Sequence, residues 1–484
     1  MRGTPRLLIA GLSGDTGKTI VSLSLLRALR SRGVKVAPFK KGPDYIDAAW
    51  LGWAADTACR NLDTFMVPAE SVRQRFGASS TGRDLALIEG NRGLFDGQDL
   101  EGTHSSASLA RLLAAPVILV VDATKATRTL AALVMGAMVF EPGVAIAGVI
   151  LNRVAGTRHE SIARATIEQG CGIPVLGALP KLGSGRALIP SRHLGLVPPT
   201  ETDECAEIKT RLTELALHHL DLDALIEIAH RFDQPVNTAE PVSPARATCT
   251  IGVFRDSVFT FYYPENLEAL EQAGARLVAI DSLTDQSLPV GLDGLYIGGG
   301  FPETQLDRLA GNRALMRSVH RAADSGLPVY AECGGLIYLA RTLCRDDRTY
   351  QLAGVFDIDL TMQHKPCGHG YVDATVDVVN PFLAPGTRIR GHEFHYTGAS
   401  GSMSTQTCLK IETGVGLGGG RDGLLKKNVM ASYVHIHADG VSCWAPSFVN
   451  AAARYRQQRS SSTASTDSSP EEEPEPSVAK SLTM

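Results

Sequence analysis

The feature that most constrains this sequence is a repeated alternation of short apolar runs with longer amphipathic segments. In the first half, runs of Val, Ile, Leu and Ala predict strands at 6–10, 34–39, 85–89, 117–122, 145–151 and 174–178. Helical patterns predict helices over 18–31 and 203–230. Because the apolar runs do not alternate with polar residues, both faces of each strand should be buried, as in a parallel sheet covered by helices.

The same alternation restarts in the second half, after a segment rich in Pro and small polar residues. Strands are predicted at 250–254, 276–280, 294–297 and 328–331, with helices at 264–273 and 313–325. A second α/β unit is therefore expected. The predicted domains are 1–232 and 249–455, joined by a linker at 233–248. Residues 456–484 are rich in Ser, Thr, Glu and Pro, so a disordered acidic tail is predicted there.

Composition excludes several function classes. A net charge of −4 supplies no basic field for nucleic acid, and the longest apolar stretches, such as 116–121, are too short to span a bilayer. Nine cysteines without CxxC spacing are typical of reduced thiols. With a first strand expected almost at the N-terminus, no targeting segment is predicted. We expect a cytoplasmic protein without nucleic-acid or membrane partners; the oligomeric state stays open, with a homodimer as the assembly considered.

A glycine-rich loop joins the first predicted strand to the first predicted helix. Its sequence is GLSGDTGKT, from Gly11 to Thr19, with five residues between Gly11 and Gly17 where the standard phosphate loop has four. Glycines let a backbone curl around phosphates, and the helix N-terminus adds partial positive charge. Lys18 is expected to reach the terminal phosphates, and the Thr19 hydroxyl to bind Mg²⁺. The predicted nucleotide-binding residues of this loop are Gly14, Thr16, Gly17, Lys18 and Thr19.

Polar residues follow other predicted strands, where α/β proteins place their ligands. Glu89 ends the run LALI and is a candidate carboxylate for Mg²⁺. Asn152 follows Ile150 and Leu151 and is a candidate for reading the nucleotide base; an ordinary turn at the strand end explains it equally well.

A second polar cluster lies in the segment KKGPDYID, from Lys40 to Asp47. Asp44 and Asp47 are three residues apart, after a rigid Gly-Pro turn and close behind Lys40. This pattern indicates a substrate or phosphorylation site, with a solvated loop as the alternative. Asp96, in a glycine-rich loop, is a weaker companion.

Cys333 follows a predicted strand and precedes two glycines, which predicts a sharp strand-to-helix turn. Such a turn lifts the side chain out of the sheet, so Cys333 is predicted to be a nucleophile. The predicted base is His435, in a run SYVHIH expected to be a strand, where His435 and His437 would point to the same face. The predicted oxyanion donors are the backbone N–H groups of Gly299, Gly300 and Gly334.

The segment 390–396 (RGHEFHY) is dense in polar side chains. It lacks the spacing of a zinc helix, and no Cys or His cluster completes a metal site. A buried hydrogen-bonding network that shapes the site is the preferred interpretation.

The motifs together resemble those of the cobyrinic acid a,c-diamide synthases, glutamine-dependent amidotransferases of cobalamin biosynthesis. The similarity runs from about residue 6 to residue 449. The motifs that carry it are GDTGKT at 14–19, FKKGPDYID at 39–47, PSRHLGL at 190–196, FYYPENL at 261–267, GGGFPE at 298–303, AECGG at 331–335 and RGHEFHY at 390–396.

The resemblance implies two coupled domains. The first resembles the P-loop ATPases of dethiobiotin-synthetase type, which share the longer loop; it would phosphorylate a carboxylate of cobyrinic acid, with ATP as co-substrate and Mg²⁺. The second resembles class I glutamine amidotransferases, in which Cys333 would form a glutamyl thioester from L-glutamine and release ammonia. Ammonia would displace phosphate at the c and then the a acetate side chain.

By match of motif, the resemblance also implies residue roles. Lys18 would bind phosphates, and Thr19, Asp47 and Glu89 the metal. Asp44 and Asp47, with Lys40 and Asp96, would sit where the substrate carboxylate meets the γ-phosphate.

One departure concerns the nucleophile. Class I enzymes place Glu two residues after the catalytic His, and this position is His437. The resembled family also lacks that Glu. A Cys–His dyad is therefore expected, with a glutaminase that stays slow until substrate closes the site.

Other families share parts of this pattern. The same chemistry on hydrogenobyrinate or nickel-sirohydrochlorin is the strongest rival. Cobyric acid synthase is disfavoured by the GPDYID loop and by Glu332, and CTP synthase by the missing His-x-Glu. A partition-type ATPase would carry an extra Lys where Ser13 stands and would need no cysteine turn.

Overall fold

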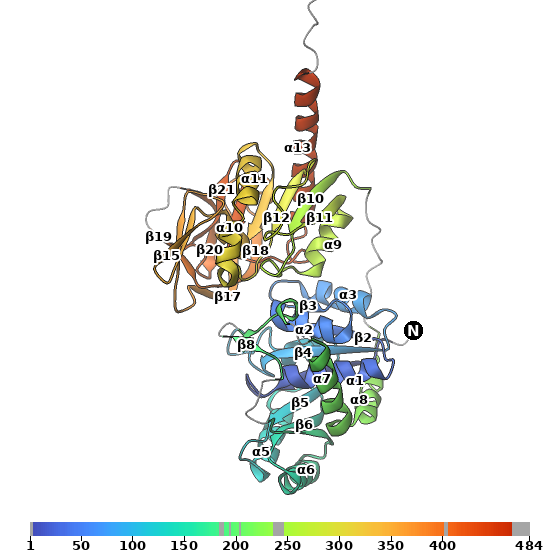
Figure 1. Ribbon diagram of the computed structural model, residues 1–484. Coiled ribbons are helices and arrows are strands. Elements are labelled where there is room, and N and C mark those ends of the chain that lie inside the picture. Colours follow the sequence, from blue (N-terminus) through green and yellow to red (C-terminus); the bar gives the residue numbers. More distant parts are fainter. Residues whose placement is uncertain are drawn as a thin grey trace, which may run out of the picture.

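The computed structural model describes residues 3–182, 188–192, 195–202, 205–235, 246–400 and 405–466. Two α/β halves lie one above the other, the first coloured blue to green and the second yellow to red (Figure 1). Most of the expected linker, residues 236–245, lies outside the described residues.

The first half is a seven-stranded parallel sheet with the order β3-β2-β4-β1-β5-β6-β7. Its strands are β1 (Arg6–Gly11), β2 (Val36–Lys41), β3 (Arg60–Leu62), β4 (Leu85–Gly93), β5 (Val117–Asp122), β6 (Ile146–Val154) and β7 (Val175–Pro180). Its helices are α1 (Lys18–Ser31), α2 (Tyr45–Ala55), α3 (Ala69–Ser80), α4 (Ser106–Leu112), α5 (Arg128–Phe140), α6 (Thr157–Cys171), α7 (Cys205–His219) and α8 (Leu222–His230). The predicted parallel α/β sheet is confirmed.

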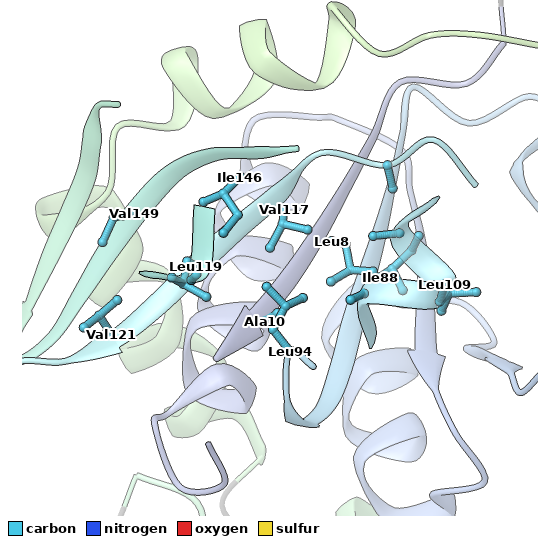
Figure 2. Packing of buried hydrophobic residues seen from close by; sticks show 14 of the residues in the cluster. Leu8, Ala10, Ile88, Leu94, Leu109, Val117, Leu119, Val121, Ile146 and Val149 are labelled. Carbon is cyan, nitrogen blue, oxygen red and sulfur yellow. The ribbon is translucent and has the colours of Figure 1, made fainter. Parts of the chain in front are cut away.

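Apolar residues cover both faces of this sheet, which explains the non-alternating runs. In β1, Leu8 and Ala10 belong to one hydrophobic cluster, while Leu7 and Ile9 belong to the cluster on the other face. Figure 2 shows Leu8 and its neighbours from β4, β5 and β6 packing on the first face. Helices therefore have to cover both faces, as the sequence predicts.

The long helix expected over 203–230 is two helices. The chain breaks between α7 and α8, where the Asp221 side chain accepts a hydrogen bond from the Ala224 N–H at 3.0 Å. An aspartate in this N-cap position satisfies an otherwise unpaired donor and favours a new helix start.

The second half is built on a nine-stranded sheet with the order β11-β10-β12-β13-β22-β21-β20-β17-β18. The strands of this sheet are β10 (Cys249–Phe254), β11 (Ala275–Ile280), β12 (Gly294–Ile297), β13 (Val329–Glu332), β17 (Gly368–Val376), β18 (Arg388–His395), β20 (Gln406–Thr413), β21 (Arg421–Lys426) and β22 (Val429–Ser432). From β11 to β22 the neighbours are parallel, and beyond β22 they are antiparallel.

The helices and small sheets of this half complete the fold. Its helices are α9 (Pro264–Gln272), η2 (Pro302–Gln305), α10 (Leu306–Gly311), α11 (Arg313–Asp324), α12 (Gly334–Leu339) and α13 (Trp444–Thr466). A four-stranded sheet contains β14 (Thr342–Arg345), β15 (Arg348–Gln351), β16 (Asp359–Met362) and β19 (Thr397–Ser400). A small two-stranded sheet in the first half contains β8 (Ser191–Arg192) and β9 (Gly195–Leu196), followed by η1 (Pro199–Glu201).

Helix α13 corrects the expected start of the tail. It continues to Thr466, whereas disorder was expected from residue 456, and it projects away from the first half (Figure 1). Arg456 donates to the Thr248 carbonyl at 3.0 Å, and Arg459 donates to Asp293 at 2.8 Å, so these turns are tied to the sheet. The rest of the predicted tail, 467–484, lies outside the described residues. Within the described ranges, no helix is long and apolar enough to cross a membrane.

Candidate active site

The phosphate loop lies between β1 and α1. Gly17 adopts a left-handed conformation (φ 92°), and a Cβ there would lie 2.1 Å from Asn152 Nδ2, so only glycine fits. Asn152 Nδ2 donates to the Thr16 carbonyl at 2.8 Å. Lys18 Nζ donates across the loop to the Ser13 carbonyl at 3.0 Å. The loop is thus held at both sides in a curled form that suits phosphate oxygens.

The residues predicted to bind nucleotide differ in which of their groups are available to it. Gly14 lies in open space. The Thr16 side chain is buried against Gly11, so Thr16 can offer phosphates only its backbone. Asn152 holds the loop through its amide, and its part in reading a base stays a proposal.

Parallel pairing brings Lys40 of β2 beside Glu89 of β4. Lys40 Nζ donates to Glu89 Oε1 at 2.8 Å and to Asp47 Oδ2 at 2.7 Å, and the Thr19 hydroxyl donates to Glu89 Oε1 at 2.9 Å. Burial acts to lower the pKa of Lys40, but Asp47 and Glu89 outweigh it and raise this pKa above its ordinary value. Lys40 is therefore a fixed cation between two carboxylates.

Two pKa values at this edge are shifted by the same environment. Burial, helped by the neighbouring Asp47, raises the pKa of Asp44 to about 6. Burial and the nearby charge of Lys40 lower the pKa of Lys18. Both groups would respond to the arrival of a phosphate, whose negative charge favours protonated groups beside it.

The residues present fit a magnesium ion. Glu89 is fully buried, and its Oε2 has no hydrogen-bond partner among the described residues. With the Thr19 hydroxyl, it offers the hard oxygen ligands that Mg²⁺ prefers when phosphates supply the rest. No group of three His, Cys, Asp or Glu side chains suited to a metal occurs in the described parts of the chain.

A cavity of about 500 Å³ lies between the two halves. From the first half it is lined by Lys41, Asp44, Tyr45, Ile46, Asn91 and Asp96, among others. From the second half it is lined by Gly300, Cys333, His392, Glu393, His395 and His435, among others. The predicted carboxylates Asp44 and Asp96 therefore face the same space as the predicted nucleophile.

Asp44 and Asp96 are both held by backbone contacts. Asp44 caps α2, its side chain accepting from the Asp47 N–H at 2.9 Å. Asp96 Oδ2 accepts from the Gly93 N–H at 2.9 Å. These bonds fix the carboxylates at the cavity wall.

Cys333 occupies the turn between β13 and α12 with φ 47° and ψ −96°, a strained conformation for a residue other than glycine. Its N–H donates to the Ser432 carbonyl at 2.7 Å, and its thiol donates to the Phe394 carbonyl at 3.7 Å. Burial, followed by the charge of Glu303, raises the pKa of the Cys333 thiol well above its ordinary value. A thiol in this state needs a base before it can act as a nucleophile.

His435 and His437 do not lie in a strand, which corrects the sequence prediction. Strand β22 ends at Ser432, and His435 instead forms an isolated bridge with His392. His435 lines the cavity with Cys333, whereas His437 Nε2 faces Glu265 at 3.7 Å. The two side chains diverge because the chain has left the pleated geometry that would align alternate residues.

The three glycines predicted to supply oxyanion donors lie together, near Cys333 and His435. A Cβ on Gly299 would lie 2.5 Å from His435 Cε1, and one on Gly334 would lie 3.1 Å from the Gly300 nitrogen. The Gly334 N–H also counteracts the rise in the Cys333 pKa, because it favours the thiolate. Gly300 has φ 153°, and a Cβ there would collide with the Val258 carbonyl at 1.8 Å. These backbones can approach a substrate only because side chains are absent.

The polar segment 390–396 forms much of β18 and supplies part of the buried network expected from its sequence. His392 Nε2 is 2.8 Å from the Tyr263 hydroxyl. Glu393 accepts from the Val415 and Gly416 N–H groups at 2.6 and 2.8 Å. Burial, with His435 nearby, holds the pKa of His392 well below its ordinary value, so His392 stays neutral.

Tyr45, which lines the cavity, and Glu332, which does not, have no role among the sequence predictions. Tyr45, beside Asp44, stacks on Phe261 with ring centroids 4.9 Å apart and meets the His435 ring edge-on at 5.3 Å. Glu332, directly before Cys333, lies with its Oε2 3.5 Å from His435 Nδ1. Each stands next to a predicted site residue, a position that does not indicate the direction of the side chain.

Contacts between the halves fix the cavity. The Tyr371 hydroxyl donates to Asp63 Oδ2 at 2.6 Å, and its ring stacks on Phe65 with centroids 4.3 Å apart. Arg75 donates twice to Asp439, at 2.9 and 2.7 Å. The two halves therefore meet through an ion pair, a hydrogen bond and stacked rings, and of these residues Tyr371 also lines the cavity.

Comparison with known proteins covers both halves. A CobQ/CobB/MinD/ParA nucleotide binding domain matches residues 7–186, and a CobB/CobQ-like glutamine amidotransferase domain matches residues 250–442. The chain is 42% identical over 472 residues to a cobyrinate a,c-diamide synthase of Magnetococcus marinus, covering 94% of this chain and 98% of that protein. Proteins of the same name from Archaeoglobus fulgidus and Listeria monocytogenes are each 38% identical, covering 90% and 89% of this chain and 94% and 96% of their own lengths.

Proposed function

Because this chain belongs to the cobyrinate a,c-diamide synthase family and is a glutamine-dependent amide-forming ligase, we propose that it converts cobyrinate to its a,c-diamide with ATP and glutamine. The observation that carries the proposal is the single cavity that reaches both Asp44 and Cys333. A carboxylate is a poor electrophile until its oxygen becomes a leaving group, and free ammonia is mostly ammonium at neutral pH. A shared cavity between Asp44 and Cys333 would bring an activated carboxylate and newly released ammonia close together.

In the first half, ATP would bind with its phosphates on the loop and on Lys18. A carboxylate oxygen of the substrate would attack the γ-phosphorus beside Asp44 and Asp47, giving an acyl phosphate and ADP. Lys40, already paired with Asp47 and Glu89, would place one cation beside the transferred phosphoryl group. Bound Mg²⁺, held by Thr19 and Glu89, would supply charge neutralisation of the phosphates.

In the second half, the Cys333 sulfur would attack the side-chain amide carbon of glutamine. His435 would take the thiol proton and pass it to the leaving nitrogen, releasing ammonia and leaving a glutamyl thioester. The N–H groups around Gly300 and Gly334 would stabilise the oxyanion. Ammonia would cross the cavity and displace phosphate, first at the c and then at the a acetate.

The direct test incubates the protein with cobyrinic acid, ATP, Mg²⁺ and glutamine and follows the products by mass spectrometry. Conversion through a monoamide to a diamide is the expected result. Parallel reactions with hydrogenobyrinate compare ring preference. Faster conversion of the metal-free ring, or no conversion of cobyrinic acid despite glutaminase activity, would overturn the substrate assignment.

Thr19 provides a matched test of the metal site. The Thr19→Val variant keeps the side-chain shape but loses the hydroxyl that donates to Glu89, whereas Thr19→Ser keeps the hydroxyl. We expect valine to lower kcat for ATP-dependent amidation by about 10²-fold, as for loss of one preorganised polar group, and serine to stay near wild type. Magnesium titrations of both variants check the cause. Equal rates for the two variants would contradict a role for the hydroxyl.

Tyr371 tests whether the closed interface retains ammonia. The Tyr371→Phe variant keeps the ring stacked on Phe65 and removes only the hydrogen bond to Asp63. Because a hydrogen bond to a charged group contributes roughly 1.5–3 kcal/mol, the interface should open more often and ammonia should escape. The measured quantity is glutamine hydrolysed per amide formed, which should rise. Tyr350→Phe, in the outlying strand β15, is the control; a rise in both variants would contradict the interpretation.

A further inference from the structure

The carboxylate of Glu332 lies where an orienting group for the catalytic histidine is expected. Glu332 Oε2 is 3.5 Å from His435 Nδ1, and both side chains are almost completely buried. The sequence predicted a pair of Cys333 and His435 without a third member, because the residue two positions after His435 is His437. The structure places a different carboxylate, that of Glu332, near His435.

Glu332 is rigidly held. It is the last residue of β13 and pairs with Ser432 in the parallel register with β22. Its Oε2 accepts from the Tyr296 hydroxyl at 3.2 Å, and its Oε1 accepts from the Ile436 N–H at 3.3 Å. The second bond ties the carboxylate to the backbone directly after His435. A side chain fixed at both oxygens can hold its neighbour in one orientation.

The other groups around His435 cannot take this role. His392 stacks on the His435 ring with centroids 4.8 Å apart, and burial keeps His392 neutral. Tyr45 meets the ring edge-on, and burial raises the pKa of its hydroxyl, so Tyr45 supplies no charge. Among the described residues His435 Nδ1 forms no hydrogen bond, and the Glu332 carboxylate lies 3.5 Å from it.

His437 has a carboxylate partner of its own. Glu265 is fully buried, 3.7 Å from His437 Nε2 and 3.5 Å from Arg60 NH1 of the other half. This second pair faces the interface between the halves, and neither residue lines the cavity that contains Cys333. His435 and His437 thus each face one carboxylate, and of these two pairs only His435 belongs to the cavity that contains Cys333.

We propose that Glu332, the residue directly before the nucleophile, is the positioning carboxylate of the glutaminase and replaces the glutamate that class I enzymes place two residues after the histidine. This inference rests on the proposed function. Glu332 keeps the proton of His435 on Nδ1, which leaves Nε2 free to accept the thiol proton. It also stabilises the imidazolium that forms when Cys333 attacks.

Glu332 directly precedes Cys333 in the chain, so the carboxylate and the nucleophile are mechanically linked. Glu332 and Cys333 share one turn, so any movement of the nucleophile also moves the carboxylate. At 3.5 Å the two groups form no hydrogen bond, and catalytic hydrogen bonds are often long or unformed without substrate. Glutamine binding at the turn should shorten this separation, which raises activity only when the site is filled.

The test compares Glu332→Gln, Glu332→Asp and Glu265→Gln by glutaminase kinetics without ATP, and by amidation supported by glutamine or by ammonium. Glu332→Gln should lower glutaminase kcat by about 10²-fold or more, given that loss of the orienting Asp in a serine-protease triad costs about 10⁴. KM for glutamine should change less than threefold, as expected for a group that does not touch the substrate. The ratio of glutamine-supported to ammonium-supported amidation should fall with kcat.

The other two variants separate positioning from packing. Glu332→Asp keeps the charge and should recover part of the lost kcat, whereas Glu265→Gln should leave the glutaminase within threefold of wild type. Equal losses in Glu332→Gln and Glu265→Gln, or no loss in the former, would overturn the inference. Absence of any glutaminase in the wild-type protein would instead overturn the proposed function.

Discussion

Replacing Cys333 with serine should abolish amide formation from glutamine while synthesis from high ammonium continues. Cys333 lies in a strained turn and lines the same cavity as His435, and a serine hydroxyl is a far weaker nucleophile there than a thiolate. We expect glutamine-supported kcat to fall by at least about 10³-fold, because removing a nucleophile usually costs this much or more. The two activities are compared by mass spectrometry of the amidated product.

Cys443→Ser is the matched control, because Cys443 is exposed at the start of α13 and lines no part of the cavity. Its glutamine-supported activity should equal that of the wild-type protein. If Cys333→Ser abolished ammonium-supported synthesis as well, the assignment of separate nitrogen-releasing and carboxylate-activating sites would be wrong.

Replacing Glu89 with glutamine should lower amidation from glutamine and from ammonium together, unlike Cys333→Ser, which should spare synthesis from ammonium. The substitution removes the charge that balances Lys40 and the buried oxygen available to a metal beside Thr19. The loss in kcat should be about 10²–10³-fold, as for removal of one preorganised electrostatic group. Product formation with glutamine and with ammonium is measured at saturating ATP over a range of Mg²⁺ concentrations.

Glu70→Gln provides the control, since Glu70 is an exposed acid of the same half and pairs only with surface residues of α3. Thermal unfolding of both variants shows whether the buried network has lost stability, because one partner of Lys40 has been removed. Loss of glutamine-supported activity alone in Glu89→Gln would contradict the role of this edge in ATP-dependent activation.

Local patterns identified much of the candidate site. The helix at Lys18–Ser31 and the strand Val117–Asp122 begin and end where the sequence predicted, because periodicity and flanking glycines are local properties. The phosphate loop and the turn at Cys333 were also visible, since each requires small residues at fixed offsets between a strand and a helix. The role of each residue there remains a proposal.

Other features depend on where the chain goes after an element ends. The sequence placed His435 and His437 on one strand face, but β22 stops at Ser432 and the two side chains diverge. It expected disorder from residue 456, but Arg456 and Arg459 bind backbone and side-chain groups of the sheet and extend α13. Both outcomes depend on partners far away in the sequence.

The sequence by itself determined the two α/β halves, the phosphate loop and the strained turn at Cys333. The tertiary structure decided which side chains meet: Lys40 lies between Asp47 and Glu89, Glu332 lies beside His435, and Asp44 shares a cavity with Cys333. The physical reason is the separation in sequence between the residues that interact. Backbone conformation follows from neighbouring residues, whereas the direction of a buried charge depends on strand register and on the packing of two halves whose residues are hundreds of positions apart.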